Sequence, residues 1–141
     1  MNIKNLTIKS QEALQQAQQI AQSYGQQQLE NEHIFKGILE VDENVTPFIL
    51  KKLNVNVDLF KKILDSTIQS FPKVSGGEIM LSREANTALN EANIIAKKMN
   101  DEYVSIEHLI LAIFKSKSKV AQILKDQGVT YNGLESAIAE I

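Results

Sequence analysis

The chain of 141 residues has no cysteine, no tryptophan, two prolines and a single arginine. The absence of cysteine excludes disulfides, thiolate catalysis and zinc sites built on cysteine ligands. Its 15 basic and 17 acidic side chains give a net charge of -2, whereas a dedicated nucleic-acid-binding protein usually carries a large basic excess. With 43% hydrophobic residues, the composition is that of a globular protein, and the length suits one domain or two small ones sharing a core.

Long apolar runs are also missing. The longest run extends from Leu109 to Phe114, far below the roughly 20 residues that span a bilayer. The first residues, MNIKNLTIKSQEAL, contain no apolar segment of the kind found in secretory signals. No segment alternates with period two between turn signals, so strands are not expected. These absences favour a cytoplasmic, all-α protein without a membrane partner.

The most informative feature is an internal duplication. When residues 7–39 are aligned with residues 82–114, at an offset of 75, eight positions are identical, and they fall at the apolar spacing of a helix. A slip of one residue extends the match, with 49–51 falling on 123–125. A repeated apolar stripe with a divergent exterior predicts two copies of one packing unit. The identical pairs are Ala13/Ala88, Leu14/Leu89, Ala17/Ala92, Ile20/Ile95, Ala21/Ala96, Glu32/Glu107, His33/His108 and Ile38/Ile113.

Each copy is predicted to contain four helices, giving a pseudo-twofold, all-α fold of about eight helices. Thr7 and Ser82 are expected to cap the first helix of each copy, because a hydroxyl can accept from the unpaired N–H groups of the first turn. The first helix is expected over residues 8–24. The third helix of copy one is expected to start near Pro47, a residue suited to the first helical turn, and its counterpart to run over 120–125.

Residues 70–81 are predicted to link repeat one, about 7–69, to repeat two, about 82–141, within a single domain 1–141. Pro72 is expected to end the fourth helix, and Ser75-Gly76-Gly77 to give the linker flexibility. A copy of about 65 residues buries only ~60% of its unfolded surface, so packing between the copies is expected to supply the stability. Residues 136–141 stay in helical register without a stop signal, which indicates a domain cut from a longer chain.

No pattern typical of catalysis is present. Gly128 and Gly133 have the glycine spacing of a phosphate-binding loop, but Leu134 and Glu135 follow where lysine and Ser/Thr would be required. These glycines are therefore interpreted as turn and cap residues. No Gly-x-Ser-x-Gly elbow is present. The chain is predicted not to be an enzyme, and to hold no cofactor and no metal.

A Glu-His pair recurs at the start of the second helix of each copy, as Glu32-His33 and Glu107-His108. A glutamate there complements the helix dipole, and the imidazole can bond to a neighbouring loop. The repetition favours a structural role over a metal site, which would need a third ligand. The lysine-rich exterior of copy two has little aromatic content near its lysines, and Arg83 is the single arginine of the chain, which favours a solvated surface and no nucleic-acid partner.

Taken together, these residues resemble the double Clp-N repeat, the N-terminal domain of Clp/Hsp-type AAA+ unfoldases, over essentially the whole chain. The resemblance is carried by Leu6-Thr7 before a Gln/Ala-rich helix, by the doubled Glu-His pair, and by Ile-Leu-Lys before a turn in both copies. Within that family, residues 71–77 and 101–109 look most like the ClpB disaggregases. Residues 105–108 match only in part the Gly-Thr-Glu-His start of the second helix that is usual in the protease-linked ClpC and ClpA branches.

The resemblance implies a mobile module of a hexameric, ATP-driven chaperone of the stress response, working with a co-chaperone system. Such a module would bind unfolded or aggregated polypeptide and pass it to the AAA+ pore, while ATP and magnesium would bind in AAA+ modules absent from this chain. At two positions where relatives often place leucine, this chain has Glu91 and His108. The substrate-binding residues implied by the resemblance are Thr7, Asp101 and Glu107 as polar contacts, with Leu89, Ile95, Tyr103 and Leu109 near an apolar groove.

Two alternatives stay open at this point. One is an adaptor- or substrate-docking domain of a ClpC/ClpA-type unfoldase. The other is a stand-alone helical adaptor that docks one partner protein. All three readings predict protein binding without catalysis, and a downstream sequence with nucleotide-binding motifs would separate the last from the others.

Overall fold

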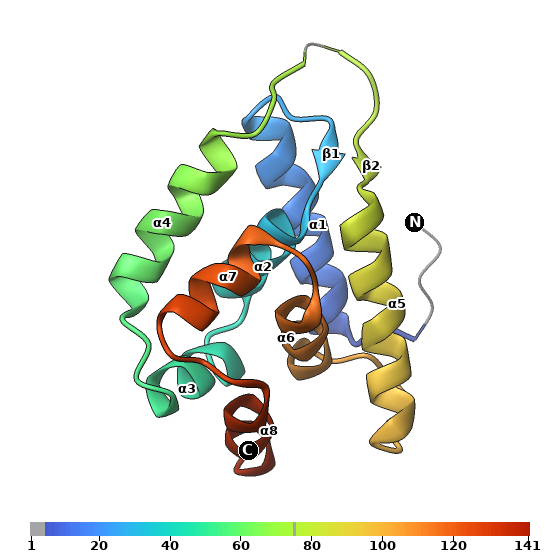
Figure 1. Cartoon of the computed structure of the whole chain (residues 1–141). Coiled ribbons are helices and arrows are strands. Elements are labelled where there is room, and N and C mark those ends of the chain that lie inside the picture. The colour runs from blue at the N-terminus through green and yellow to red at the C-terminus, as the bar shows by residue number, and fades with distance from the viewer. Residues whose placement is uncertain (1–4, 75) are drawn as a thin grey trace.

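The computed structural model describes residues 5–74 and 76–141, which form eight helices and two very short strands (Figure 1). The prediction of an all-α fold with about eight helices is confirmed. No helix among these residues is long and apolar enough to cross a membrane. The elements are α1 (Ile8–Ser23), β1 (Gln28–Leu29), α2 (Asn31–Val41), α3 (Val45–Lys52), α4 (Val57–Gln69), β2 (Met80–Leu81), α5 (Arg83–Lys98), α6 (Ile106–Lys115), α7 (Lys119–Asp126) and α8 (Tyr131–Ala139).

The long helices of the two copies begin in the same way. Thr7 Oγ1 accepts a hydrogen bond from Ser10 N at 3.1 Å, and Ser82 Oγ accepts one from Ala85 N at 3.0 Å. Both caps are the ones predicted from the sequence. They fix α1 and α5 as equivalent elements of copy one (residues 7–69) and copy two (residues 82–141).

The helix ends repeat as well, with glycine and asparagine exchanged between the copies. The residue after the end of α1 is Gly25 with φ +68°, and its counterpart after α5 is Asn100 with φ +61°. The end of α3 has Asn54 at φ +59°, and the end of α7 has Gly128 at φ +87°. Glycine and asparagine are the residues that tolerate this left-handed conformation at least cost. The assignment of Gly128 as a turn residue is thus confirmed.

The expectation that no strands would form was wrong at one place. β1 pairs in parallel with β2, with Gln28 opposite Met80 and Leu29 opposite Leu81. A matching bridge joins Leu6 to Val104. Each strand has only two residues, too few to show alternation. The partner of β1 lies at the end of the linker, about 50 residues further along the chain, so local sequence carried no signal.

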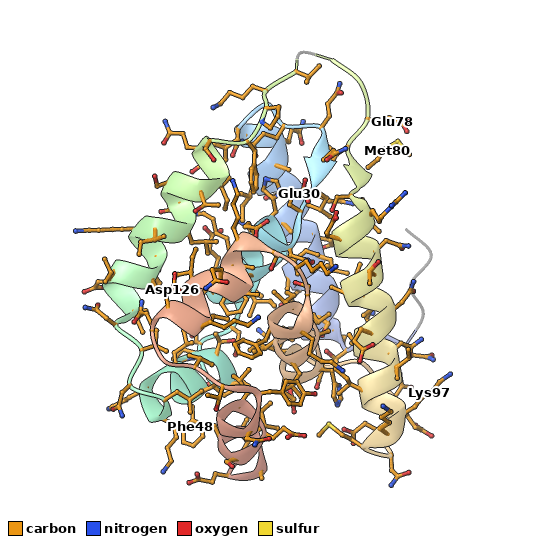
Figure 2. All side chains as sticks on the ribbon, viewed as in Figure 1. Glu30, Phe48, Glu78, Met80, Lys97 and Asp126 are labelled. Carbon is orange, nitrogen blue, oxygen red and sulfur yellow. The ribbon has the colours of Figure 1, made fainter. Side chains whose placement is uncertain are left out.

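The helices of the two copies also pack across the duplication (Figure 1). In copy one, α3 contacts α6 and α8 of copy two, while α7 of copy two contacts α2 and α4 of copy one. One continuous hydrophobic core therefore runs through both copies. At its centre lie fully buried side chains from both, including Phe35, Phe60, Ile38, Leu109 and Leu111. The outer faces carry most of the charged side chains, and Figure 2 shows Lys97 and Asp126 among them.

The third helix begins two residues earlier than predicted, because an acidic side chain caps it. Asp42 Oδ2 accepts from Thr46 N and Thr46 Oγ1, each at 2.7 Å, and Asp42 Oδ1 accepts from Val45 N at 3.1 Å. Pro47 still lies in the first turn. The fourth helix ends before Pro72, as predicted. Of the predicted flexible triplet, Ser75 lies outside the described residues.

Candidate functional site

A pocket of about 410 Å³ lies between α5, α6 and α8, entirely within copy two. Ile95 and Leu111, from α5 and α6, are almost fully buried and line it from the core side. Met99 and Ile141 line it as exposed apolar side chains, 43% and 58% accessible. We call this the copy-two pocket. Its apolar lining residues are Ile95, Met99, Leu111, Tyr131, Ile138, Ala139 and Ile141.

Five charged residues also line this pocket: Glu91, Lys98, Glu107, Lys115 and Glu135. Lys115 Nζ is 2.9 Å from Glu91 Oε2, and this hydrogen bond raises the pKa of Lys115 above its ordinary value. The same ammonium lies 5.7 Å from the centre of the Tyr131 ring, within the range of a cation–π contact. The pocket therefore combines an apolar floor with an ion pair at its edge.

Next to the pocket runs an edge of polar residues made of Thr7, Asp101, Tyr103 and Glu107, which we call the polar edge. Thr7 reaches it from the other end of the chain, because its N–H donates to Val104 O at 3.0 Å. Tyr103 is 54% exposed, and the side chain of Asp101 is 47% exposed. Glu107 belongs both to this edge and to the pocket lining. Glu107 is thus the residue that joins the polar edge to the pocket.

His108 fixes the geometry of the polar edge from below. It is 1% exposed, and its Nδ1 accepts a hydrogen bond from Ser105 N at 2.9 Å. In the neutral ring the proton therefore sits on Nε2, which donates to Asp101 Oδ2 at 2.8 Å. The prediction of a structural role for the repeated histidine, bonded to a neighbouring loop, is confirmed here.

In copy one the equivalent histidine makes the same connections. His33 Nδ1 accepts from Glu30 N at 2.9 Å, and its Nε2 lies 2.6 Å from Gln26 Oε1. Burial lowers the pKa of His33 to about 4, so the ring is neutral. Gln26 stands where copy two has Asp101. Among the residues described, no group of three or more acidic or histidine side chains could hold a metal ion.

The position equivalent to the copy-two pocket is filled in copy one. Lys36 occupies the place of Leu111 in the repeat alignment and forms an ion pair with Asp65, whose counterpart is Ala139. Glu40 adds a second carboxylate at 3.8 Å from the Lys36 ammonium. These side chains leave a space of only about 130 Å³. At these equivalent positions, the described residues therefore form an open apolar pocket in copy two and a filled one in copy one. Copy one has a different hollow, of about 590 Å³, where α3 meets α4, lined in part by Leu39, Pro47 and Val55.

The two repeated glutamates, Glu32 and Glu107, also differ between the copies: Glu32 is buried, whereas Glu107 is half-buried at the pocket. Glu32 is 4% exposed and its Oε2 accepts from Val120 N at 2.8 Å, which caps α7 of the other copy. Burial raises the pKa of Glu32, and the hydrogen bond from Val120 partly offsets this effect. Glu107 is the counterpart of Glu32 in copy two, and α3 is the counterpart of α7 in copy one. Asp42 already caps α3, so Glu107 does not have this role and lies half-buried at the pocket.

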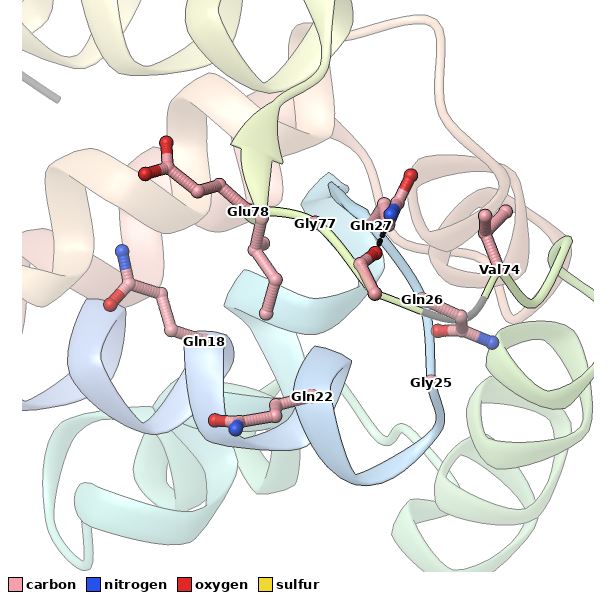
Figure 3. Close-up of a pocket in the computed structure, with 10 residues that line it drawn as sticks. Gln18, Gln22, Gly25, Gln26, Gln27, Val74, Gly77 and Glu78 are labelled. Atoms are coloured by element: carbon pink, nitrogen blue, oxygen red, sulfur yellow. Dashed lines mark hydrogen bonds between the residues drawn. The ribbon is translucent and has the colours of Figure 1, made fainter.

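A second cavity, of about 570 Å³, lies where the end of α1 meets the linker (Figure 3). Its lining is rich in glutamine amides, among them Gln18 and Gln22, and includes the backbone of Gly76 and Gly77. Gln27 donates to the Gly76 carbonyl, the dashed contact of Figure 3. This cavity lacks the apolar floor of the copy-two pocket, so it is the weaker candidate for binding an apolar segment.

Comparison with known proteins identifies this arrangement. The sequence model of the Clp repeat (R) N-terminal domain matches residues 5–127. The chain belongs to the family of Clp repeat N-terminal domains. It is 50% identical over its whole length to the chaperone protein ClpB of Bacteroides thetaiotaomicron and 43% identical to that of Porphyromonas gingivalis. The chain spans 16% of the length of each of these relatives, at their N-terminal region.

Solved structures give the same fold. The N-terminal domain of Hsp104 from Candida albicans superposes with a TM-score of 0.83 at 20% identity, covering 95% of this chain and 89% of that one. A complex of the ClpV N-domain with a VipB peptide superposes with a TM-score of 0.79 at 18% identity, covering 96% and 85%. These similarities establish the fold of the Clp N-terminal domain described here.

The predicted site residues fall into three groups. Ile95 and Glu107 line the copy-two pocket, and Thr7, Asp101 and Tyr103 lie along the polar edge. Leu89 and Leu109 do not line the pocket; they are 3% and 1% exposed and belong to the core of the domain. Glu91 lines the pocket, whereas His108 is buried beneath the edge.

Sequence reasoning missed the part of the pocket contributed by Met99, Leu111 and the residues of α8. A signal was present in the repeat alignment, where Leu111 replaces Lys36 and Ala139 replaces Asp65. At both positions copy two is apolar where copy one is charged. Comparing the copies for differences, as well as for identities, would have pointed to this face of copy two.

Proposed function

We propose that this chain is the substrate-recognition domain of a ClpB-type chaperone, and that it captures unfolded or aggregated polypeptide in the copy-two pocket. The open apolar pocket, present in one copy and filled by Lys36 and Asp65 in the other, carries this proposal. An unfolded segment would place apolar side chains on Ile95, Leu111 and Ile138. Its backbone would meet the hydrogen-bonding groups of the polar edge.

The remainder of the protein supplies the energy in this proposal. The ClpB relatives extend far beyond the region matched here, and their further modules would bind ATP and magnesium and form the hexamer. The domain itself would have no ATPase role. It would hold a segment and release it to the AAA+ pore, in cooperation with a co-chaperone system. The peptide seen with the ClpV N-domain supports the idea that this fold can bind a polypeptide segment.

Binding is expected to be weak and reversible. A threading machine must release what it captures, and ordering a flexible segment opposes its binding. We therefore expect a Kd of ~1 μM to ~1 mM for a permanently unfolded polypeptide, equivalent to roughly -8 to -4 kcal/mol. Reduced and carboxymethylated α-lactalbumin is a suitable probe because it cannot refold.

The test uses two exposed methionines, one inside the pocket and one outside. Met99 lines the pocket and is 43% exposed, whereas Met80 is 69% exposed and projects outward beside β2 (Figure 2). Met99→Ser is expected to weaken binding of the unfolded probe about three- to tenfold, because apolar contact area is lost. Met80→Ser is the matched control and should bind like the parent.

Equal binding by both variants, with unchanged melting temperatures, would show that the pocket is not the capture site. Titration with native α-lactalbumin separates the alternatives. A domain that prefers the native protein to its unfolded form would act as a docking adaptor, and the proposal of substrate capture would be wrong.

A further inference from the structure

We propose that the copy-two pocket selects apolar segments that carry a lysine or an arginine beside the apolar side chain. This inference rests on the proposed function and names the class of segment that the pocket prefers. The observation that carries it is the distribution of charge around the apolar floor, with Glu91 in an ion pair at the edge and two further carboxylates beside it.

The carboxylates at the pocket outnumber the ammonium groups. Glu91, Glu107 and Glu135 face it, against Lys98 and Lys115. Glu91 is the only one of the three that forms an ion pair among the residues the structure describes, through Lys115. Among the residues described, an incoming cation therefore finds two carboxylates without an ion-pair partner, whereas an incoming carboxylate finds one such ammonium, that of Lys98.

The Glu91–Lys115 pair is also arranged so that it can exchange partners. Both side chains are partly exposed, 27% for Glu91 and 45% for Lys115. The Lys115 ammonium has the Tyr131 ring as a second partner, so it keeps a favourable contact when a ligand cation takes over Glu91. A lysine in the captured segment can thus replace Lys115 without leaving a buried charge unpaired.

The test compares three labelled, unstructured peptides with the same Leu-Phe-Leu core between glycine and serine spacers. The core is flanked on both sides by lysine, by glutamine or by glutamate. Fluorescence anisotropy with the 141-residue domain should rank them in that order. The lysine peptide should bind roughly fivefold more tightly than the glutamate peptide at low salt, and the difference should shrink at ~1 M salt.

Two variants locate the effect. Glu91→Gln should reduce the preference for the lysine peptide, since it removes one carboxylate from the pocket while keeping its shape. Glu12→Gln is the matched control, because Glu12 forms an exposed ion pair with Lys9 at 3.4 Å and does not line the pocket. The control should rank the peptides as the parent does.

Three peptides that bind equally well, with the preference absent at every salt concentration, would overturn this inference and leave the proposed capture function intact. A preference for the glutamate peptide, or one unaffected by Glu91→Gln, would also overturn it. No binding of any peptide would instead contradict the proposed function itself.

Discussion

His108 Nε2 lies 2.8 Å from Asp101 Oδ2, whereas the equivalent His33 Nε2 lies 2.6 Å from the neutral amide of Gln26. Both histidines follow a glutamate and are the third residue of their helices, α2 and α6. The difference lies in the residue that closes the preceding helix. In copy one this residue is Gln26, and its Nε2 also donates to Ile68 O at 2.6 Å, which links the end of α1 to α4. Copy two instead presents a half-exposed carboxylate at the polar edge.

The burial of His33 predicts acid sensitivity. Its pKa is lowered from 6.5 to about 4 by burial, so below pH 6.5 the unfolded chain binds a proton that the folded chain refuses. The contribution of a neutral His33 to the free energy of unfolding is therefore fully retained above pH 6.5 and falls by about 3 kcal/mol as the pH decreases to about 4. Urea unfolding at several pH values measures this slope.

The matched variant is His33→Gln, since glutamine can accept the same backbone N–H at the third helical position. We expect a shallower loss of stability between pH 6.5 and pH 4 than in the parent. Parallel pH curves for the two proteins would contradict the assignment of a neutral, buried His33.

The carboxyl of Glu32 predicts the opposite pH dependence. Burial raises its pKa above the unfolded value, so its favourable contribution is present at low pH and is lost as the pH rises through the folded pKa. Glu32→Gln keeps an oxygen for Val120 N and removes the charge. At pH 7 this variant should be as stable as the parent or more stable, whereas Glu32→Leu should lose ~1–3 kcal/mol because the amide of Val120 is left unpaired. Denaturant unfolding of both variants measures the two stabilities. A Glu32→Gln variant as unstable as Glu32→Leu would contradict the raised pKa of Glu32.

Asp42 is predicted to stabilise α3. Burial favours its neutral form, but the hydroxyl of Thr46 and the amides of residues 44–46 donate to it and lower its pKa. Asp42→Ala should cost ~1–2 kcal/mol at neutral pH. The difference from the parent should disappear as the pH falls below the pKa of the folded protein, since the carboxylate is then protonated. Glu43→Ala, at the exposed neighbouring residue, is the control and should leave the unfolding midpoint unchanged.

The packing between the copies predicts a single unfolding transition. Because α3 packs on α6 and α8, and α7 packs on α2 and α4, neither copy can unfold and leave the other intact. Calorimetry should give one peak, with equal calorimetric and van't Hoff enthalpies. Two resolved peaks would mean that the linker joins independent domains.

The sequence was sufficient for the parts of this molecule that depend on local periodicity and on the duplication. Helix positions, the Thr7 and Ser82 caps and the role of the histidines follow from apolar spacing and from first-turn chemistry. The parallel pairing of 28–29 with 80–81 could not be predicted, because it joins copy one to the end of the linker and extends over only two residues. The early start of α3 depends on Asp42, a side chain that no helical pattern includes.

The candidate site was predicted in part for a similar reason. Ile95 and Glu107 line the pocket, but Leu89 and Leu109 do not. An apolar stripe does not show which of its members lie beside a pocket and which face only the core. The contribution of α8 depends on how that helix docks against α5 and α6. Tertiary packing, which the sequence pattern does not specify, decides which apolar residues are left open to a ligand.

The central claim is that copy two, and not copy one, captures unfolded polypeptide. Amide chemical shifts of the isotope-labelled domain, recorded during titration with reduced and carboxymethylated α-lactalbumin, test it most directly. We expect the changes to concentrate around Met99, Glu107, Leu111 and Ile138, with little change around Lys36 and Asp65. Changes centred on Lys36 and Asp65, or on Gln18 and Gln22 beside the linker, would contradict the claim.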